Sequence, residues 1–401
     1  MQLADSLRAE GFGGRVTLVD AEAGLPYQRP PLSKDFLAAG GTPELLPLKA
    51  RKFFVDTKID LIEANPITAV DRREKAVTLA NGDRLEYSAL VFATGARTRR
   101  LDVPGVGLGG VHHLRNADDA TRLHSELDAA STVVVVGAGF IGLEFASAAV
   151  DRGLDVTVVE LGPRAMGRAV STQISEHFRT LHSARGVRFV FGQTVTALEG
   201  DGERVSSVVG GDGQRYPADL VVVGIGVEPN DAAAAEAGLR TGNGIVVDEY
   251  LRTDDDAIWA IGDCARFPCR HAGAPTRRES IQNAVDQART LAATLARRPT
   301  EYHHLPWFWS HQAKNKLQIA GVPRDDGPTM VIGDVAAGKF SVLRFDETQL
   351  VCVESVNHPA AHMAARTILA IPHSMSREEL AVVDFDLKQA AKLVRSTERI
   401  D

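Results

Sequence analysis

Cysteine is scarce in this 401-residue chain, which contains three, Cys264, Cys269 and Cys352. Three cysteines are too few for a disulfide-rich framework. None belongs to a C-x-x-C pair, which argues against dithiol redox chemistry. Long apolar runs are also missing, because no stretch reaches the ~18 residues of a membrane span. Residues 1–10 have no signal-peptide core. We therefore expect a cytoplasmic protein.

An excess of positive charge is missing too. The chain has 45 Lys and Arg against 52 Asp and Glu, a net charge of −7. This balance offers no broad basic field for nucleic acid or anionic lipid. The pairs His112-His113 and His303-His304 lack a third ligand at a suitable spacing, so no metal site is predicted.

What the chain does have is a regular alternation of strand-like and helical stretches, which is typical of α/β domains with parallel sheets. Residues 87–96 recur in outline as residues 216–226, which indicates two related nucleotide-binding units. After residue 305 the pattern changes to Trp307-Phe308-Trp309 and short strands. This last part is expected to form a separate α+β domain.

The strongest local motif is an apolar strand, residues 133–136, that runs into G-x-G-x-x-G and then a helix. Gly137 makes the tight turn, Gly139 lets the backbone approach a pyrophosphate, and Gly142 permits close helix packing. The helix N-terminus supplies the anion site. This context predicts a dinucleotide-binding site.

Glu160 ends the next predicted strand, where it can accept hydrogen bonds from an adenosine ribose. Its charge repels a 2′-phosphate, so we expect NADH to be preferred over NADPH. Arg164 and Arg168 follow closely, and either could instead receive a phosphate.

A second nucleotide site is indicated by Asp263, which follows an apolar strand over residues 258–261. Open α/β sheets bind ligands at the carboxyl ends of their strands. A ribityl chain needs such an acceptor, although Asp263 could also be a helix cap or turn residue. Thr94-Gly95 closes another strand in the same way.

Several segments together resemble one family over nearly the whole chain, the FAD-dependent NADH–ferredoxin reductases of bacterial cytochrome P450 and dioxygenase systems, which include putidaredoxin and rubredoxin reductases. The segments that carry the resemblance are LPYQRPPLSK (25–34), ATG (93–95), the fingerprint with Glu144, GIGVEPN (224–230), IGDCA (261–265), ESIQNA (279–284) and PWFWS (306–310).

The resemblance implies an α/β, glutathione-reductase-like fold with two Rossmann-type nucleotide-binding domains and a C-terminal α+β domain. Residues 1–112 and 240–304 would form a discontinuous FAD-binding domain. Residues 113–239 would form the NAD-binding domain, and residues 305–401 a C-terminal interface domain.

One departure concerns the start of the chain. The family opens with a strand and its own G-x-G-x-x-G for the FAD pyrophosphate, whereas residue 1 here falls within the helix that follows that loop. Because the loop supplies amides that neutralise the pyrophosphate, we expect FAD to bind more weakly without it. Asp20 and Glu22 bracket the expected ribose-binding acid, but Ala21 aligns best with it.

The resemblance also assigns site residues. Lys34 would lie beside flavin N5, and Glu144 would form an ion pair with it near the hydride path. The alternatives are a solvated loop lysine for Lys34 and a surface salt bridge for Arg115. The residues placed at FAD are Asp20, Glu22, Lys34, Ile67, Thr94, Gly95, Arg115, Asp263, Ile281 and Trp309. Those placed at NADH are Gly137, Gly139, Gly142, Glu144, Glu160, Arg168 and Gly226.

The function implied is hydride transfer from NADH to FAD, followed by single-electron transfer to a [2Fe–2S] ferredoxin that serves a cytochrome P450 or dioxygenase. The alternatives are a rubredoxin reductase, a quinone or monodehydroascorbate reductase, or a flavin-free NAD-binding remnant without catalysis. An acidic ferredoxin needs a local cationic patch. Its candidate residues are Arg266, Arg270, Arg277, Arg278, Lys314 and Lys316.

Overall fold

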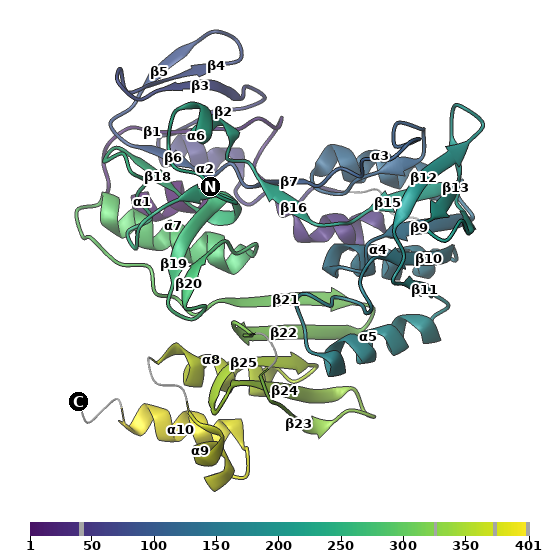
Figure 1. The fold of residues 1–401 in the computed structure, drawn as a ribbon. Helices are drawn as coiled ribbons and strands as arrows, with labels where there is room; N and C mark the ends of the chain where they lie inside the picture. The colour runs from purple at the N-terminus through teal and green to yellow at the C-terminus, as the bar shows by residue number, and fades with distance from the viewer. Residues whose placement is uncertain (40–43, 325–326, 372–374, 398–401) are drawn as a thin grey trace. The chain divides into compact units, whose positions relative to one another are not determined.

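A computed structural model describes residues 1–39, 44–324, 327–371 and 375–397. The chain divides into two compact units, each assembled from separate segments (Figure 1). Unit 1 consists of Met1–Gln28, Leu46–Arg97 and Glu228–Pro306. Unit 2 consists of Arg29–Leu45, Thr98–Val227 and Trp307–Asp401.

Parallel strand pairs form the centre of unit 1. Strand β1 (Val16–Val19) pairs with β2 (Ile59–Ile62), and β6 (Leu90–Phe92) pairs with β18 (Ile258–Ala260). Helix α1 (Gln2–Ala9) packs on α7 (Ile281–Leu295). The core around β6 and β18 includes Phe92, Ile258 and Leu291, which are almost fully buried.

The other elements of unit 1 are shorter and lie around these pairs. Strands β3 (Ile67–Asp71), β4 (Ala76–Leu79) and β5 (Arg84–Glu86) form an antiparallel meander. The remaining elements are α2 (Arg51–Asp56), α6 (Ala232–Glu236), β17 (Ile245–Val246), η3 (Gly262–Cys264), β19 (Ala265–Cys269) and β20 (Ala274–Thr276). Strands β7 (Ala96–Thr98) and β16 (Val227–Pro229) pair where the chain leaves unit 1 and re-enters it.

A five-stranded parallel sheet organises the first part of unit 2, in the order β11-β10-β9-β15-β8. The central strand is a run of valines, and Val133 to Val136 are buried, as expected of a parallel strand covered on both faces. The strands are β8 (Val111–His112), β9 (Thr132–Val136), β10 (Asp155–Glu160), β11 (Arg188–Phe191) and β15 (Leu220–Val223). The helices are α3 (Ala117–Leu127), α4 (Phe140–Asp151) and α5 (Thr172–Ala184).

Two smaller parts also belong to unit 2. An antiparallel meander consists of β12 (Val195–Gly200), β13 (Val205–Gly210) and β14 (Arg215–Pro217). Two single-turn 3-10 helices, η1 (Pro30–Ser33) and η2 (Asp35–Leu37), lie in the Arg29–Leu45 segment of this unit.

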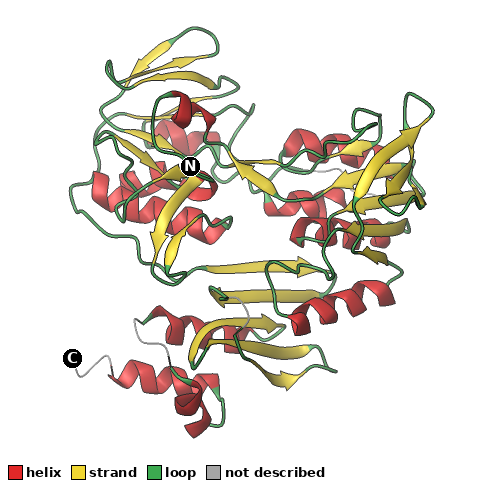
Figure 2. Cartoon of the chain, in the orientation of Figure 1, coloured by secondary structure: helices red, strands yellow, loops and turns green. Residues whose placement is uncertain are grey.

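The C-terminal part is an antiparallel sheet in the order β21-β22-β25-β24-β23, with helices beside it (Figure 2). Helix α8 (Pro359–Ala370) packs on β22 and β25, and α10 (Leu387–Thr397) packs on α8. The other elements are β21 (Trp307–Gln312), β22 (Asn315–Gly321), β23 (Thr329–Asp334), β24 (Lys339–Asp346), β25 (Gln349–Val356) and α9 (Arg377–Val382). The predicted α/β class with a C-terminal α+β domain is confirmed.

Over the described residues, no helix has both the length and the apolar character that crossing a bilayer requires.

Candidate functional site

The glycine fingerprint joins β9 to α4 in unit 2. Gly137 has φ +104°, and a Cβ on it would lie 2.5 Å from the Gly224 carbonyl oxygen. A Cβ on Gly142 would lie 2.3 Å from the Gly137 carbonyl oxygen, so both positions exclude side chains. Gly139 precedes α4 without a side-chain cap. The first amides of the helix are therefore available to an anion.

Glu160 lies at the end of β10 and is tied to this loop. One carboxylate oxygen accepts a hydrogen bond of 2.6 Å from the Ala138 N–H, and the other accepts one of 2.6 Å from the Gly162 N–H. The acid is thus held beside the fingerprint, and its remaining lone pairs can accept from ribose hydroxyls.

The two arginines that follow Glu160 differ in what they contact. Arg164 donates to the carbonyls of Gly167 and Val170, and burial together with Arg344 lowers its pKa. Its guanidinium therefore forms hydrogen bonds within its own loop. Arg168 is exposed and approaches Gly226, where a Cβ would lie 3.7 Å from Nη2. The structure therefore brings Arg168 and Gly226 together, as two residues predicted at the same nucleotide.

Lys34 and Glu144 form an ion pair within unit 2, with Nζ 2.6 Å from Oε2. The Lys34 side chain is 23% exposed and Glu144 is 5% exposed. The pair joins the end of η1 to the first turns of α4. The structure thus brings together two residues 110 positions apart that were predicted as neighbours. Their part in hydride transfer stays a prediction.

Two serines complete the surroundings of the buried carboxylate. Ser33 Oγ donates to Glu144 Oε2 at 2.6 Å, and Ser310 Oγ donates to Oε1 at 2.7 Å. A buried charge is tolerated only when it is paired and hydrogen-bonded. Sequence reasoning missed both serines as site residues, although each belongs to a segment that carried the family resemblance, RPPLSK and PWFWS.

In unit 1, the structure brings Thr94-Gly95 and Asp263 to one edge. They follow β6 and β18, which are neighbouring parallel strands. The Gly262 N–H donates to Gln287 Oε1 at 2.6 Å, whereas Gln287 Nε2 is buried and has no partner among the described residues. A carboxylate and an unpaired amide donor suit a ligand rich in hydroxyl groups, such as the ribityl chain of FAD.

The acids after β1 are used in local contacts. Asp20 Oδ1 accepts from the Glu22 N–H at 3.0 Å, which closes a turn, and the Glu22 carboxylate accepts from the Tyr27 hydroxyl.

The two isoleucines predicted at FAD begin other elements of unit 1. Ile67 begins β3, and Ile281 begins α7 with 44% of its surface exposed. The α7 N-terminus leaves main-chain amides for an acceptor.

The remaining two residues predicted at FAD belong to unit 2. Arg115 precedes α3, and its main-chain N–H donates a hydrogen bond of 3.0 Å to Asp119 Oδ2. Trp309 is half-buried on β21, with its ring centroid 5.5 Å from that of Trp307.

The prediction that Arg277 belongs to an exposed cationic patch for ferredoxin is wrong. The Arg277 side chain is 7% exposed, forms an ion pair of 2.8 Å with Glu279, and donates to the Asp263 carbonyl at 3.1 Å. Arg266 donates to the Gly242 carbonyl at 2.9 Å. Charge in the sequence does not reveal burial, and Arg277 is an internal support of the Asp263 turn.

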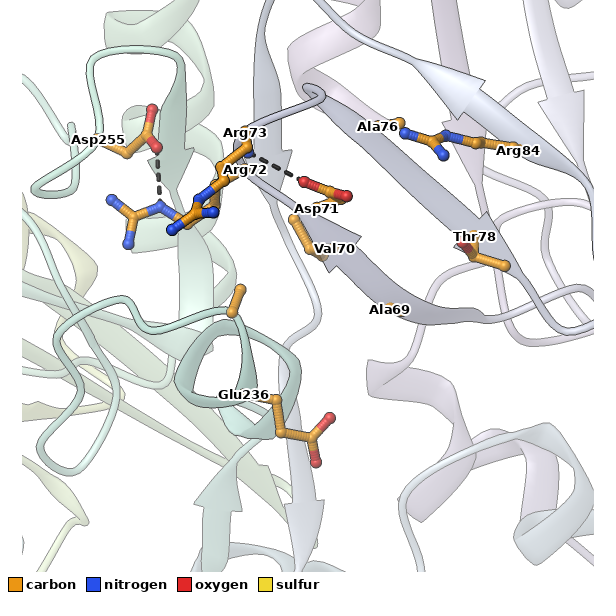
Figure 3. Close-up of a pocket in the computed structure, with 11 residues that line it drawn as sticks. Ala69, Val70, Asp71, Arg72, Arg73, Ala76, Thr78, Arg84, Glu236 and Asp255 are labelled. Carbon is orange, nitrogen blue, oxygen red and sulfur yellow. Dashed lines mark hydrogen bonds and ion pairs between the residues drawn. The ribbon is translucent and has the colours of Figure 1, made fainter.

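A hollow in unit 1 is lined by residues other than those predicted at the nucleotides (Figure 3). It is bordered by strands β3 to β5 and helix α6, rather than by the carboxyl ends of β6 and β18. Arg72 beside it pairs with Asp255 at 2.8 Å, and the Arg73 N–H donates to Asp71. The charges of Arg72 and Asp255 at this hollow therefore neutralise each other.

All three cysteines are free and buried, and burial raises the pKa of the Cys264 thiol. Within the described ranges, no three His, Cys, Asp or Glu side chains gather as metal ligands would.

Comparison with known proteins identifies the family of this chain. The family model for pyridine nucleotide-disulphide oxidoreductases matches residues 1–288, and that for the reductase C-terminal domain matches residues 307–391. Rhodocoxin reductase from Rhodococcus erythropolis is 48% identical over 398 residues, covering 99% of this chain and 93% of that protein.

Two solved structures are also similar. The ferredoxin reductase for the CYP199A2 system from Rhodopseudomonas palustris has a TM-score of 0.94 and 46% identity, with 97% of this chain and 96% of that chain covered. The covalent putidaredoxin reductase–putidaredoxin complex gives a TM-score of 0.92 and 34% identity, covering 98% and 96%. The chain belongs to the pyridine nucleotide-disulphide oxidoreductase family and has the glutathione-reductase-like fold that its sequence predicted.

Proposed function

We propose that this chain is a flavoprotein reductase that passes electrons from NADH through FAD to a [2Fe–2S] ferredoxin of a cytochrome P450 or dioxygenase system. The observation that carries the proposal is the Lys34–Glu144 pair, set in the same unit as the glycine fingerprint. Similarity to rhodocoxin reductase and to a ferredoxin reductase of a P450 system supports the choice of partner.

Bound FAD would supply the chemistry, since a flavin accepts a hydride from NADH and releases its electrons singly. The chain's own residues bind and orient. The fingerprint would hold the NADH pyrophosphate at the α4 N-terminus, and Glu160 would accept from the adenosine ribose. Asp263 and the Thr94-Gly95 turn would hold FAD.

Lys34 and Glu144 would act next to the reacting rings. When FAD is bound, the ammonium charge of Lys34 would favour negative charge on the flavin ring. Glu144 fixes the position of that ammonium, and the two serines keep the buried carboxylate hydrogen-bonded. Correct positioning of the reactants supplies most of the acceleration in such a site, and no protein general base is required.

Preference for NADH follows from the surroundings of Glu160. The carboxylate is fixed at the ribose end of the fingerprint. The Arg164 guanidinium donates its hydrogen bonds to carbonyl groups of its own loop. A 2′-phosphate would therefore face a negative charge without help from Arg164.

The proposal is tested on purified protein supplemented with FAD. A flavin band near ~450 nm and NADH-dependent reduction of ferricyanide and of a [2Fe–2S] ferredoxin are expected. Protein that binds NADH but shows no flavin band after supplementation would instead be a flavin-free NAD-binding remnant.

A further inference from the structure

A line of buried polar side chains continues beyond the Lys34–Glu144 pair. Ser310 and Gln312 project from β21 and His182 from α5, and all three are fully buried. Besides its bond to Glu144, Ser310 Oγ lies 3.4 Å from Gln312 Nε2. Gln312 Oε1 lies 2.9 Å from His182 Nε2. The line thus connects the ion pair to a histidine on another helix.

The donor and acceptor roles along this line follow from the charge on Glu144. An ionised carboxylate only accepts, so the single hydroxyl hydrogen of Ser310 is directed to Glu144. Ser310 Oγ must then accept from the amide nitrogen of Gln312. The amide oxygen of Gln312 therefore faces His182, and His182 Nε2 must carry a hydrogen.

The other ring nitrogen of His182 favours a neutral ring. Nδ1 is buried and has no hydrogen-bond partner in the described part of the chain. A protonated ring would place a hydrogen there with nothing to receive it, at a substantial desolvation cost. Burial, together with the charge of Arg185, lowers the pKa of His182. Both observations favour the neutral Nε2–H tautomer.

We propose that His182, Gln312 and Ser310 are positioning residues, which hold Glu144, and through it Lys34, in the arrangement that hydride transfer requires. The inference rests on the proposed function. If the Ser310 hydroxyl is lost, Glu144 Oε1 loses its donor and the carboxylate can rotate. Lys34 Nζ, bonded to the other oxygen, moves with it.

The first test compares two serine-to-alanine substitutions in the same antiparallel sheet. Ser310→Ala should lower kcat for NADH-dependent ferricyanide reduction about tenfold with an unchanged KM for NADH, since small displacements cost orientation. Ser341→Ala is the matched control, because Ser341 is equally buried and its hydroxyl bonds to Ser355 and His358 rather than to Glu144. Ser310→Thr keeps a hydroxyl and should restore kcat. Equal kcat values for Ser310→Ala and Ser341→Ala would overturn the proposal.

The second test needs no catalysis. In protein labelled with 15N-histidine, the ring signal that disappears in His182→Phe should show the neutral Nε2–H tautomer at pH 7. Gln312→Leu, which removes the acceptor, should shift that signal. An Nδ1–H tautomer or a charged ring in the unsubstituted protein would overturn the proposal. A protein inactive with NADH would contradict the proposed function alone, since the ring signal still reports on the line of hydrogen bonds.

Discussion

The Glu160 carboxylate accepts a hydrogen bond of 2.6 Å from the main-chain N–H of Ala138, the second residue of the glycine fingerprint. The acid that ends β10 and the loop that ends β9 are thereby fixed to each other. A nucleotide bound at this loop meets a carboxylate whose position is set before binding.

Replacing Glu160 by alanine should therefore change nucleotide choice. Loss of the ribose acceptor should lower kcat/KM with NADH by about tenfold, the cost of one hydrogen bond to a charged group. Loss of the repulsion between Glu160 and a 2′-phosphate should reduce the difference in kcat/KM between NADH and NADPH. Steady-state kinetics with both nucleotides measure this change, with Glu199→Ala, at a half-exposed acid paired to Arg215, as the control. Equal wild-type rates with NADH and NADPH would refute the assignment.

The Lys34–Glu144 pair gives a prediction about stability and activity together. Lys34→Met leaves a buried carboxylate unpaired, so the free energy of unfolding should fall by about 3–5 kcal/mol. The double variant Lys34→Met/Glu144→Gln removes both charges and should recover most of that stability. Flavin reduction by NADH should stay slow in both variants, because the Lys34 charge is absent from each.

Denaturant unfolding and stopped-flow flavin reduction separate the two effects. Full recovery of the reduction rate in the double variant would show that Lys34 has only a structural role.

Arg277 should behave as a support of the Asp263 turn. Arg277→Gln removes a buried donor to the Asp263 carbonyl and should lower the free energy of unfolding by about 2 kcal/mol. FAD occupancy should fall with it. Arg270→Gln, at an exposed position nearby in sequence, should change neither quantity appreciably. A selective loss of ferredoxin reduction in Arg277→Gln, with FAD occupancy unchanged, would favour a docking role instead.

His362 should make the protein less stable in acid. Burial lowers its pKa to about 4, and Arg366 and Lys316 act in the same direction. Between pH 6.5 and pH 4 the unfolded chain binds a proton that the native state does not. The free energy of unfolding should therefore fall as pH drops through this window, by about 3 kcal/mol in total.

His362→Leu should remove that part of the acid sensitivity, as measured by urea unfolding between pH 7 and pH 4. His303→Gln, which changes an exposed histidine paired with Glu301, should leave it in place. An unchanged pH dependence in His362→Leu would contradict the prediction.

Local motifs in this chain could be predicted because their chemistry depends on adjacent residues. The fingerprint and Glu160 lie within one β-α-β segment, and the structure places them as the motif requires. The Lys34–Glu144 neighbourhood spans 110 positions and came only from family resemblance. The domain boundaries expected from that resemblance stay a prediction.

Other parts could not be predicted, because they depend on how separate elements meet. Ser310, Gln312 and His182 converge from a strand of the C-terminal sheet and a helix of the nucleotide-binding sheet. No spacing in the sequence relates His182 to the two residues of β21. The burial of Arg277 likewise depends on the fold of residues around Asp263, and charge alone suggested a surface position.

The most direct test of the account is an anaerobic reaction of the FAD-loaded protein with one equivalent of NADH and excess [2Fe–2S] ferredoxin. The flavin band near ~450 nm should bleach, and its recovery should accompany reduction of two ferredoxins per NADH. A flavin band that NADH leaves unchanged would contradict hydride transfer at the Lys34–Glu144 site. Bleaching without ferredoxin reduction would contradict the proposed partner.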